Sequence, residues 1–234
     1  VRDFERPYQE GIFPPSVALH QKVAEDYRIP SIDVGKALWT LVQSGKTAWE
    51  TLILDTCHPL DAGYAVYAET VRKFLESQDW EAASSEPAAL PPKRHPNAVE
   101  YTRFTDAWTV DAPGWTRENQ PVSLFPHRIA CNRPGTELEF AFRGDAIGIH
   151  WLSADDSGNV EWSVDGSPFR SRASWTPWGG KEGRGYSAMF HDPLSGSALP
   201  PGEHRLKLRV SEQTDPKSAG TWVRIAGFYT NEIP

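Results

Sequence analysis

Cysteine is scarce in this sequence, whose 234 residues include only Cys57 and Cys131. A small disulfide-stapled domain needs a patterned, even set of cysteines, and a structural zinc site needs Cys or His pairs at short spacing. Neither pattern is present, and the two cysteines lie in segments that we expect to form different domains. We therefore expect no disulfide framework, no metal site and no cofactor.

Long apolar runs and an excess of positive charge are also lacking. No apolar run approaches the roughly 20 residues that span a bilayer, and Val1–Phe4 has neither the basic nor the apolar part of a signal peptide. The 24 Lys and Arg residues face 31 Asp and Glu, a net charge of −7. This charge disfavours binding to nucleic acid or to an anionic membrane. The chain does not begin with Met, and we expect that a natural N-terminal part has been removed or is not included.

Residues 1–78 have the pattern of alternating helices and strands that is typical of an α/β layered domain. Apolar spacing and turn residues predict these elements in order: a helix Ser16–Tyr27 with Ser16 as its N-cap, a buried strand Ser31–Val34, a helix Lys36–Ser44, and a helix from the N-cap Asp61 to about Ser77. One strand cannot form a parallel sheet by itself. The segment is therefore expected to be part of a domain whose remainder lies elsewhere.

The rest of the chain changes character. Residues 79–99 are rich in Glu, Ala, Ser and Pro, which indicates a linker. Residues 100–234 show short alternating segments such as 137–142, 160–164 and 202–210, and Asp165-Gly166 is a strong hairpin signal. With ten tryptophans and twenty prolines in the chain, this part is predicted to be an all-β antiparallel sandwich, jelly-roll-like.

The stretch Asp55–Tyr67 carries the chemistry. Asp55 and His58 are three residues apart, and Pro59 keeps His58 out of a helix, so that its ring can project from a turn. Asp55 can then bind one ring nitrogen while the other faces a nucleophile, as in the second half of a hydrolytic triad. The plainer interpretation is a helix cap beside a surface histidine. Cys57 is expected to be a small buried residue of the loop rather than a nucleophile.

Residues 55–68 resemble the last sequence block of the SGNH or GDSL-type hydrolases, D-x-x-H-P-x-x-x-G-h-x-x-[YF]-A. Residues 19–34 are similar to the helix and strand that precede this block. The resemblance implies a flavodoxin-like α/β domain and a serine esterase or acylhydrolase, many of which deacetylate sugars. It also implies that His58 is the general base and Asp55 its orienting partner.

The G-D-S block that carries the nucleophile in this family does not occur in the sequence, and neither does a G-x-N-D block ahead of residue 16. Gly144-Asp145-Ala146 lacks the serine. The resemblance therefore implies the C-terminal portion of such an enzyme (residues 1–78) with an appended β-domain. A missing N-terminal segment or a second chain would supply the serine.

Two tryptophans in a Pro/Gly-rich loop, Trp175 and Trp178, are candidate substrate-binding residues, because exposed loop aromatics stack on sugar rings. Packing of these rings against the catalytic domain is the equal alternative. The expected substrate is an acylated carbohydrate or small ester, which favours secretion or the periplasm. The alternative for the whole chain is a non-catalytic carbohydrate-binding or scaffold protein with an inactive hydrolase remnant.

Overall fold

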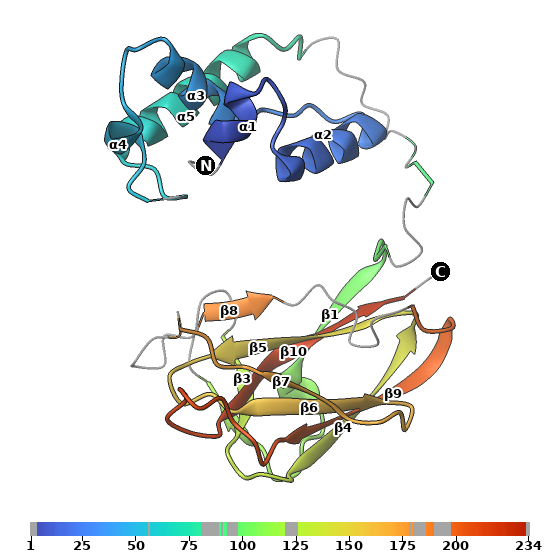
Figure 1. Cartoon of the computed structure of the whole chain (residues 1–234). Coiled ribbons are helices and arrows are strands. Elements are labelled where there is room, and N and C mark those ends of the chain that lie inside the picture. Colours follow the sequence, from blue (N-terminus) through green and yellow to red (C-terminus); the bar gives the residue numbers. More distant parts are fainter. Residues whose placement is uncertain are drawn as a thin grey trace. The chain divides into compact units, whose positions relative to one another are not determined.

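The computed structural model describes residues 4–55, 57–80, 89, 91–92, 98–119, 126–177, 179, 186–189 (backbone only) and 198–232. They belong to two compact units, Val1–Pro92 and Lys93–Pro234. Figure 1 shows the first as helical and the second as built from strands. No helix among the described residues has the length and apolar character needed to cross a membrane.

The described part of the first unit contains five helices: α1 (Glu5–Gln9), α2 (Pro15–Tyr27), α3 (Val34–Gln43), α4 (Trp49–Leu52) and α5 (Asp61–Glu76). The three long helices lie where apolar spacing predicted helices. The small core that α3, α4 and α5 share is formed by Leu38 of α3 with Trp49, Leu52 and Ile53. Val66 of α5 packs against it, so α3, α4 and α5 share one centre.

The strand predicted at Ser31–Val34 is wrong. Residues 31–33 are irregular, and Val34 is the first residue of α3. Asp33 is the N-cap of that helix, because its carboxylate accepts hydrogen bonds from the Lys36 backbone N–H (2.9 Å) and the Tyr8 hydroxyl (2.8 Å). This cap turns the chain into a helix where apolar alternation suggested a strand. The described residues of the unit contain no strand, so the α/β layer stays a prediction.

The two predicted N-caps of α2 and α5 are also wrong. Ser16 and Asp61 lie inside the first turns, and the N-cap positions are Pro14 and Leu60, which provide no side-chain cap. Pro15 instead takes the first position of α2, where a missing N–H costs little. The carboxylate of Asp61 lies in the first turn of α5, where the helix dipole favours negative charge.

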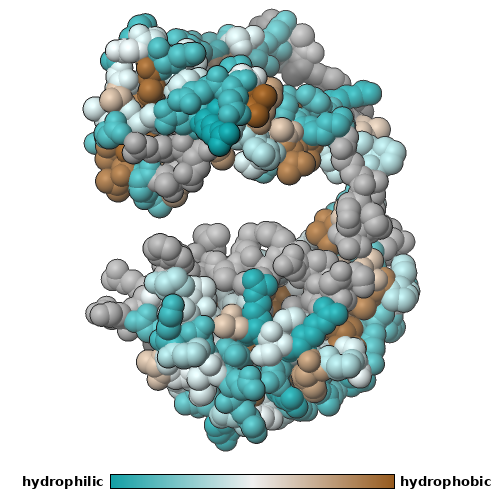
Figure 2. All heavy atoms as spheres, viewed as in Figure 1, coloured by the Kyte–Doolittle hydropathy of each residue, from teal (hydrophilic) through white to brown (hydrophobic). Residues whose placement is uncertain are grey.

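Large apolar side chains remain exposed mainly on the helical unit. Ten of the thirteen that the described residues expose lie there: Ile12, Phe13, Leu19, Val23, Ile29, Leu54, Tyr64, Val71, Leu75 and Trp80. Figure 2 shows brown residues among the teal ones on the face of this unit that it draws. The helical unit therefore buries its apolar residues less completely than the β unit.

The second unit has ten strands among its described residues: β1 (Thr102–Asp106), β2 (Thr116–Glu118), β3 (Arg128–Cys131), β4 (Glu137–Gly144), β5 (Ile147–Ser153), β6 (Asn159–Val164), β7 (Arg170–Ala173), β8 (Tyr186–Met189), β9 (Gly202–Val210) and β10 (Val223–Asn231). One antiparallel sheet has the order β2-β3-β10-β5-β8, with β1 also paired to β10. The other has the order β4-β9-β6-β7. The chain is thus β-rich, as the alternating segments predicted.

The two sheets enclose one apolar core. Leu206 and Leu208 of β9 and Ile225 and Phe228 of β10 are fully buried in it, and the Phe140 ring of β4 stacks on Phe228 with centroids 4.4 Å apart. Strand β9 follows the expected alternation, with every second residue from Leu206 buried. This period places the apolar side chains of both sheets in the space between them.

The hairpin signal at Asp165-Gly166 is confirmed. Both residues have positive φ (51° and 75°), and the Ser167 N–H donates to the Val164 carbonyl at 2.9 Å, as in a type I′ turn. The turn leads from β6 toward β7, which pair in register. Gly144-Asp145 is structural too, because buried Asp145 accepts a hydrogen bond from the Asn231 side chain at 2.6 Å.

Candidate functional site

The Asp–His motif lies in a tight loop between α4 and α5. An isolated antiparallel bridge joins Ile53 and Pro59 across the base of the loop. The Leu54 N–H donates to the His58 carbonyl at 2.8 Å, and the Leu60 N–H donates to the Leu52 carbonyl at 2.9 Å. Since Leu52 and Ile53 are buried in the core of the unit, the loop projects from a fixed base.

Gly63 lets α5 approach this base closely. A Cβ at Gly63 would overlap the carbonyl oxygen of Leu52 and crowd the side chain of Pro59. Leu52 and Pro59 both belong to the base of the motif loop. The last position of the D-x-x-H-P-x-x-x-G pattern is therefore a glycine for a steric reason, because a larger residue would prevent the close contact between α5 and the loop.

The structure brings Asp55 and His58 together. Asp55 Oδ1 accepts the backbone N–H groups of Cys57 (2.7 Å) and His58 (2.8 Å), and Asp55 Oδ2 lies 2.7 Å from His58 Nδ1. The two backbone hydrogen bonds, followed by the one from the His58 ring, hold the pKa of Asp55 well below its usual range. An ionised carboxylate only accepts hydrogen bonds, so Nδ1 carries the proton and Nε2 of a neutral ring has a free lone pair.

Both side chains are open to water in this chain. The side chain of His58 is 69% exposed and that of Asp55 is 49% exposed. The dyad is thus held by local hydrogen bonds and not by burial. Its Nε2 can be reached by a group that comes from outside the loop.

The expectation that Cys57 is buried is wrong. The residue is a free, exposed thiol, and Cys131 is free and buried. Sγ of Cys57 lies 3.3 Å from His58 Nδ1 and 3.9 Å from Nε2. Asp55, Cys57 and His58 each offer a metal-ligating atom, and these atoms lie within 4.8 Å of one another. A short D-x-C-H spacing was the available sequence signal for this cluster.

The predicted pair of substrate-binding tryptophans is described only in part. Trp175 is half-buried, and the ammonium group of Lys217 lies 6.0 Å from its ring centroid. Trp178 lies outside the described residues. The use of the two rings as a sugar platform therefore stays a prediction.

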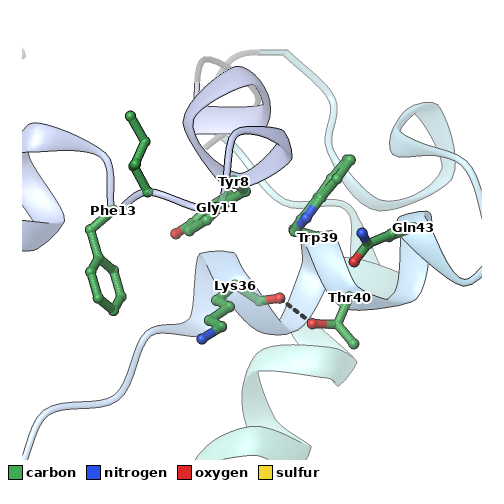
Figure 3. Close-up of a pocket in the computed structure, with 8 residues that line it drawn as sticks. Tyr8, Gly11, Phe13, Lys36, Trp39, Thr40 and Gln43 are labelled. Atoms are coloured by element: carbon green, nitrogen blue, oxygen red, sulfur yellow. Dashed lines mark hydrogen bonds between the residues drawn. The ribbon is translucent and has the colours of Figure 1, made fainter.

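Sequence reasoning missed a pocket in the helical unit. The pocket holds about 220 Å³ and is lined by residues of α1, α3 and the segment between α1 and α2: Tyr8, Gly11, Ile12, Phe13, Lys36, Trp39, Thr40 and Gln43. Figure 3 shows the Tyr8 and Trp39 rings and the Lys36 side chain around it. Burial and the hydrogen bond to Asp33 raise the pKa of Tyr8. Neither Asp55 nor His58 lines this pocket, and the irregular, proline-containing start of the chain gave no hint of it.

A second hollow lies in the β unit. It holds about 510 Å³ and is lined by the Asp165–Phe169 turn with Ser163, Arg205 and Lys207. The two basic side chains already have acidic partners, because Arg205 pairs with Glu139 at 2.7 Å and Lys207 with the same residue at 3.3 Å. The basic side chains that line this hollow are thus already paired with an acidic residue.

The fold of this chain is similar to that of a solved two-domain esterase. A two-domain esterase (CEX) active on acetylated mannans is similar to this chain at 17% identity, over 93% of this chain and 59% of its own, with a TM-score of 0.70. Its complex with mannopentaose gives 18% identity, the same coverages and a TM-score of 0.69. The chain thus spans 59% of the length of that esterase.

The other comparisons add little. An acetyl xylan esterase (Est2A) from Butyrivibrio proteoclasticus matches 58% of this chain and 34% of its own at 12% identity. Its TM-score of 0.37 is too low to support a common fold. No protein-family model and no curated protein matches the sequence. At these identities the likeness concerns the fold alone.

Proposed function

We propose that this chain supplies the Asp and His of the catalytic triad of an SGNH-type serine esterase. The observation that carries the proposal is the geometry of Asp55, which holds the turn through Oδ1 and the His58 ring through Oδ2 at 2.7 Å. A plain helix cap would not place its second oxygen on a ring nitrogen. In the neutral ring, the exposed Nε2 of His58 then has the lone pair that a general base needs.

The reaction that suits this dyad is acyl transfer to a serine and then to water. His58 Nε2 takes the proton of the serine hydroxyl as the oxygen attacks the ester carbonyl, and it returns the proton to the leaving alcohol. A water molecule then hydrolyses the acyl-enzyme with the same base. Asp55 keeps the ring in the productive tautomer and stabilises the imidazolium ion that forms in each step.

In this proposal the serine comes from outside these 234 residues, either from an upstream segment or from a second chain. The sequence contains no G-D-S block. Two observations support an additional part: the helical unit exposes ten large apolar side chains, and the chain spans only 59% of the esterase with the similar fold.

The proposed substrate is an acylated, most simply acetylated, carbohydrate. This step rests on the similar esterase, which acts on acetylated mannans, and on the loop tryptophans of the β unit. The missing G-D-S block equally favours the alternative of a non-catalytic carbohydrate-binding or scaffold protein. The two candidates differ in whether His58 is needed for turnover.

The test uses the full source protein that contains this chain, with its intact mass and N-terminal sequence determined first. Hydrolysis of p-nitrophenyl acetate and release of acetate from acetylated mannan are measured for the wild type and for His58→Ala. We expect His58→Ala to lower kcat by at least about 10³-fold. The matched control is His20→Ala, an exposed histidine of α2, which should retain full activity. Equal activity of the wild type and His58→Ala would reject the esterase assignment.

A further inference from the structure

Three different metal-ligating groups meet in the motif loop. The carboxylate of Asp55, the thiol of Cys57 and the imidazole of His58 come from four consecutive positions, and their ligating atoms lie within 4.8 Å of one another. All three residues are exposed, so a hydrated ion can reach them. Carboxylate, thiolate and imidazole together form a ligand set that suits zinc.

The distances are close to those of a zinc site. Zn–S and Zn–N bonds of about 2.3 and 2.0 Å in a tetrahedron place sulfur and nitrogen about 3.5 Å apart, and Cys57 Sγ lies 3.3 Å from His58 Nδ1. Asp55 Oδ2 is 2.7 Å from the same nitrogen, which is shorter than the roughly 3.3 Å edge expected around zinc. The two atoms must therefore separate by about 0.6 Å, which exposed side chains can accommodate.

Asp55 is already oriented for this role. Its Oδ1 is fixed by the N–H groups of Cys57 and His58, so Oδ2 stays directed at the ring whether a proton or a metal lies between them. To complete the set, the Cys57 side chain also has to turn. The ion would have three protein ligands and a fourth position open to water.

We propose that Asp55 Oδ2, Cys57 Sγ and His58 Nδ1 bind one Zn²⁺ ion, which takes the place of the proton shared by Asp55 and His58. Binding releases one proton to solvent, from the thiol. The ring proton leaves Nδ1 and moves to Nε2 through water, so the ring stays neutral. Besides the three ligand bonds, only the S–H and Nδ1–H bonds break and an Nε2–H bond forms, and nothing is oxidised or reduced.

The consequence for catalysis rests on the proposed function. With the metal on Nδ1 and the proton on Nε2, the ring has no lone pair left to accept the proton of a serine hydroxyl. Zn²⁺ is then a reversible inhibitor that acts on the base and not on the nucleophile. The loop would make the esterase sensitive to free zinc through Cys57.

Metal binding is tested first, without any activity measurement. The reduced, EDTA-treated 234-residue chain is titrated with Co²⁺ and Zn²⁺, and binding is followed by absorption and by calorimetry. We expect one ion per chain and a thiolate-to-cobalt charge-transfer band. Cys57→Ser should abolish the band and weaken Zn²⁺ binding at least about tenfold. The controls are Cys131→Ala, which removes the buried thiol, and the exposed His20→Gln, and both should retain the band.

A charge-transfer band that persists in Cys57→Ser, or no band in the wild type, would overturn the proposal. Inhibition is tested separately on the full source protein, where micromolar Zn²⁺ should suppress ester hydrolysis and EDTA should restore it. An active enzyme that binds the ion with Cys57 but is not inhibited would reject His58 as the base and leave the metal site in place. An active enzyme without the band would reject the metal site alone.

Discussion

Replacing Asp55 by Asn should reverse the tautomer of His58 while the loop keeps its fold. The side-chain carbonyl oxygen of Asn can still accept the N–H groups of Cys57 and His58, which Oδ1 now accepts at 2.7 and 2.8 Å. The amide NH₂ replaces Oδ2, which lies 2.7 Å from His58 Nδ1. Because an amide NH₂ only donates, Nδ1 must become the acceptor and the ring proton must move to Nε2.

The expected loss of activity follows from this exchange. A base whose Nε2 is already protonated cannot accept the serine proton, and the same substitution in a Ser-His-Asp triad lowers kcat about 10⁴-fold. That factor corresponds to about 5.5 kcal/mol in the activation barrier. Both backbone hydrogen bonds remain, so the free energy of unfolding should change little.

The tautomer is measured directly by ¹⁵N NMR of the histidine rings in the 234-residue chain, with EDTA present. At a pH where the ring is neutral, the wild type should show a protonated Nδ1 and an unprotonated Nε2 at His58, and Asp55→Asn should show the reverse. Asp61→Asn, a change in the first turn of α5, is the control and should match the wild type. The same tautomer in the wild type and in Asp55→Asn would refute the reasoning, whatever the activity of the full protein.

Three further changes test other parts of the structure. Gly63→Ala should destabilise the helical unit by about 1–3 kcal/mol, because a Cβ there overlaps the Leu52 carbonyl. Urea unfolding measures the loss of stability, with Ala62→Gly at the exposed neighbouring position as the comparison. Burial lowers the pKa of His150 to about 4, below its unfolded value of about 6.5, so the β unit should lose about 3 kcal/mol as the pH falls from 7 to 4. Hydrogen exchange of β10 amides should show that His150→Gln loses less stability than the wild type over this pH range. An equal dependence of stability on pH in the two proteins would contradict this prediction. Burial alone would lower the pKa of His204, but the Asp165 carboxylate at 2.6 Å and the Pro200 carbonyl outweigh it and raise that pKa. His204→Gln should therefore destabilise the hairpin at Asp165 by about 1–3 kcal/mol at pH 6. The destabilisation should be smaller as the pH rises through the pKa of His204 in the folded state.

Much of the secondary structure could be predicted because local chemistry determined it. The Asp165-Gly166 turn needs two residues that tolerate positive φ, and the sequence shows such a pair between alternating strands. Strand β9 alternates because one of its faces meets the core. The elements that were missed in the β unit, such as β2 and β7, are short strands of 3 and 4 residues with mostly exposed side chains. Too few residues alternate in them for the period to be visible.

The failures in the helical unit have a common physical cause. The segment Ser31–Val34 alternates like a strand. Its conformation is decided by the Asp33 carboxylate, which accepts hydrogen bonds from the Lys36 backbone N–H and from the hydroxyl of Tyr8, a residue distant in sequence. Likewise, the exposure of Cys57 depends on which way the loop closes at its Ile53–Pro59 base. Pattern and propensity do not contain such information.

The candidate dyad was predictable for the opposite reason, because every bond that forms it lies within four residues. Asp55 is bound to Cys57 and His58, and the base of the loop is closed by hydrogen bonds between residues 52 and 60. The geometry needs nothing from the β unit or from a segment that carries the serine. It follows that the two halves of the proposed triad can be tested apart. The ring tautomer of His58 can be read in this chain even if it has no turnover, and a wrong tautomer would reject the assignment before any serine is found.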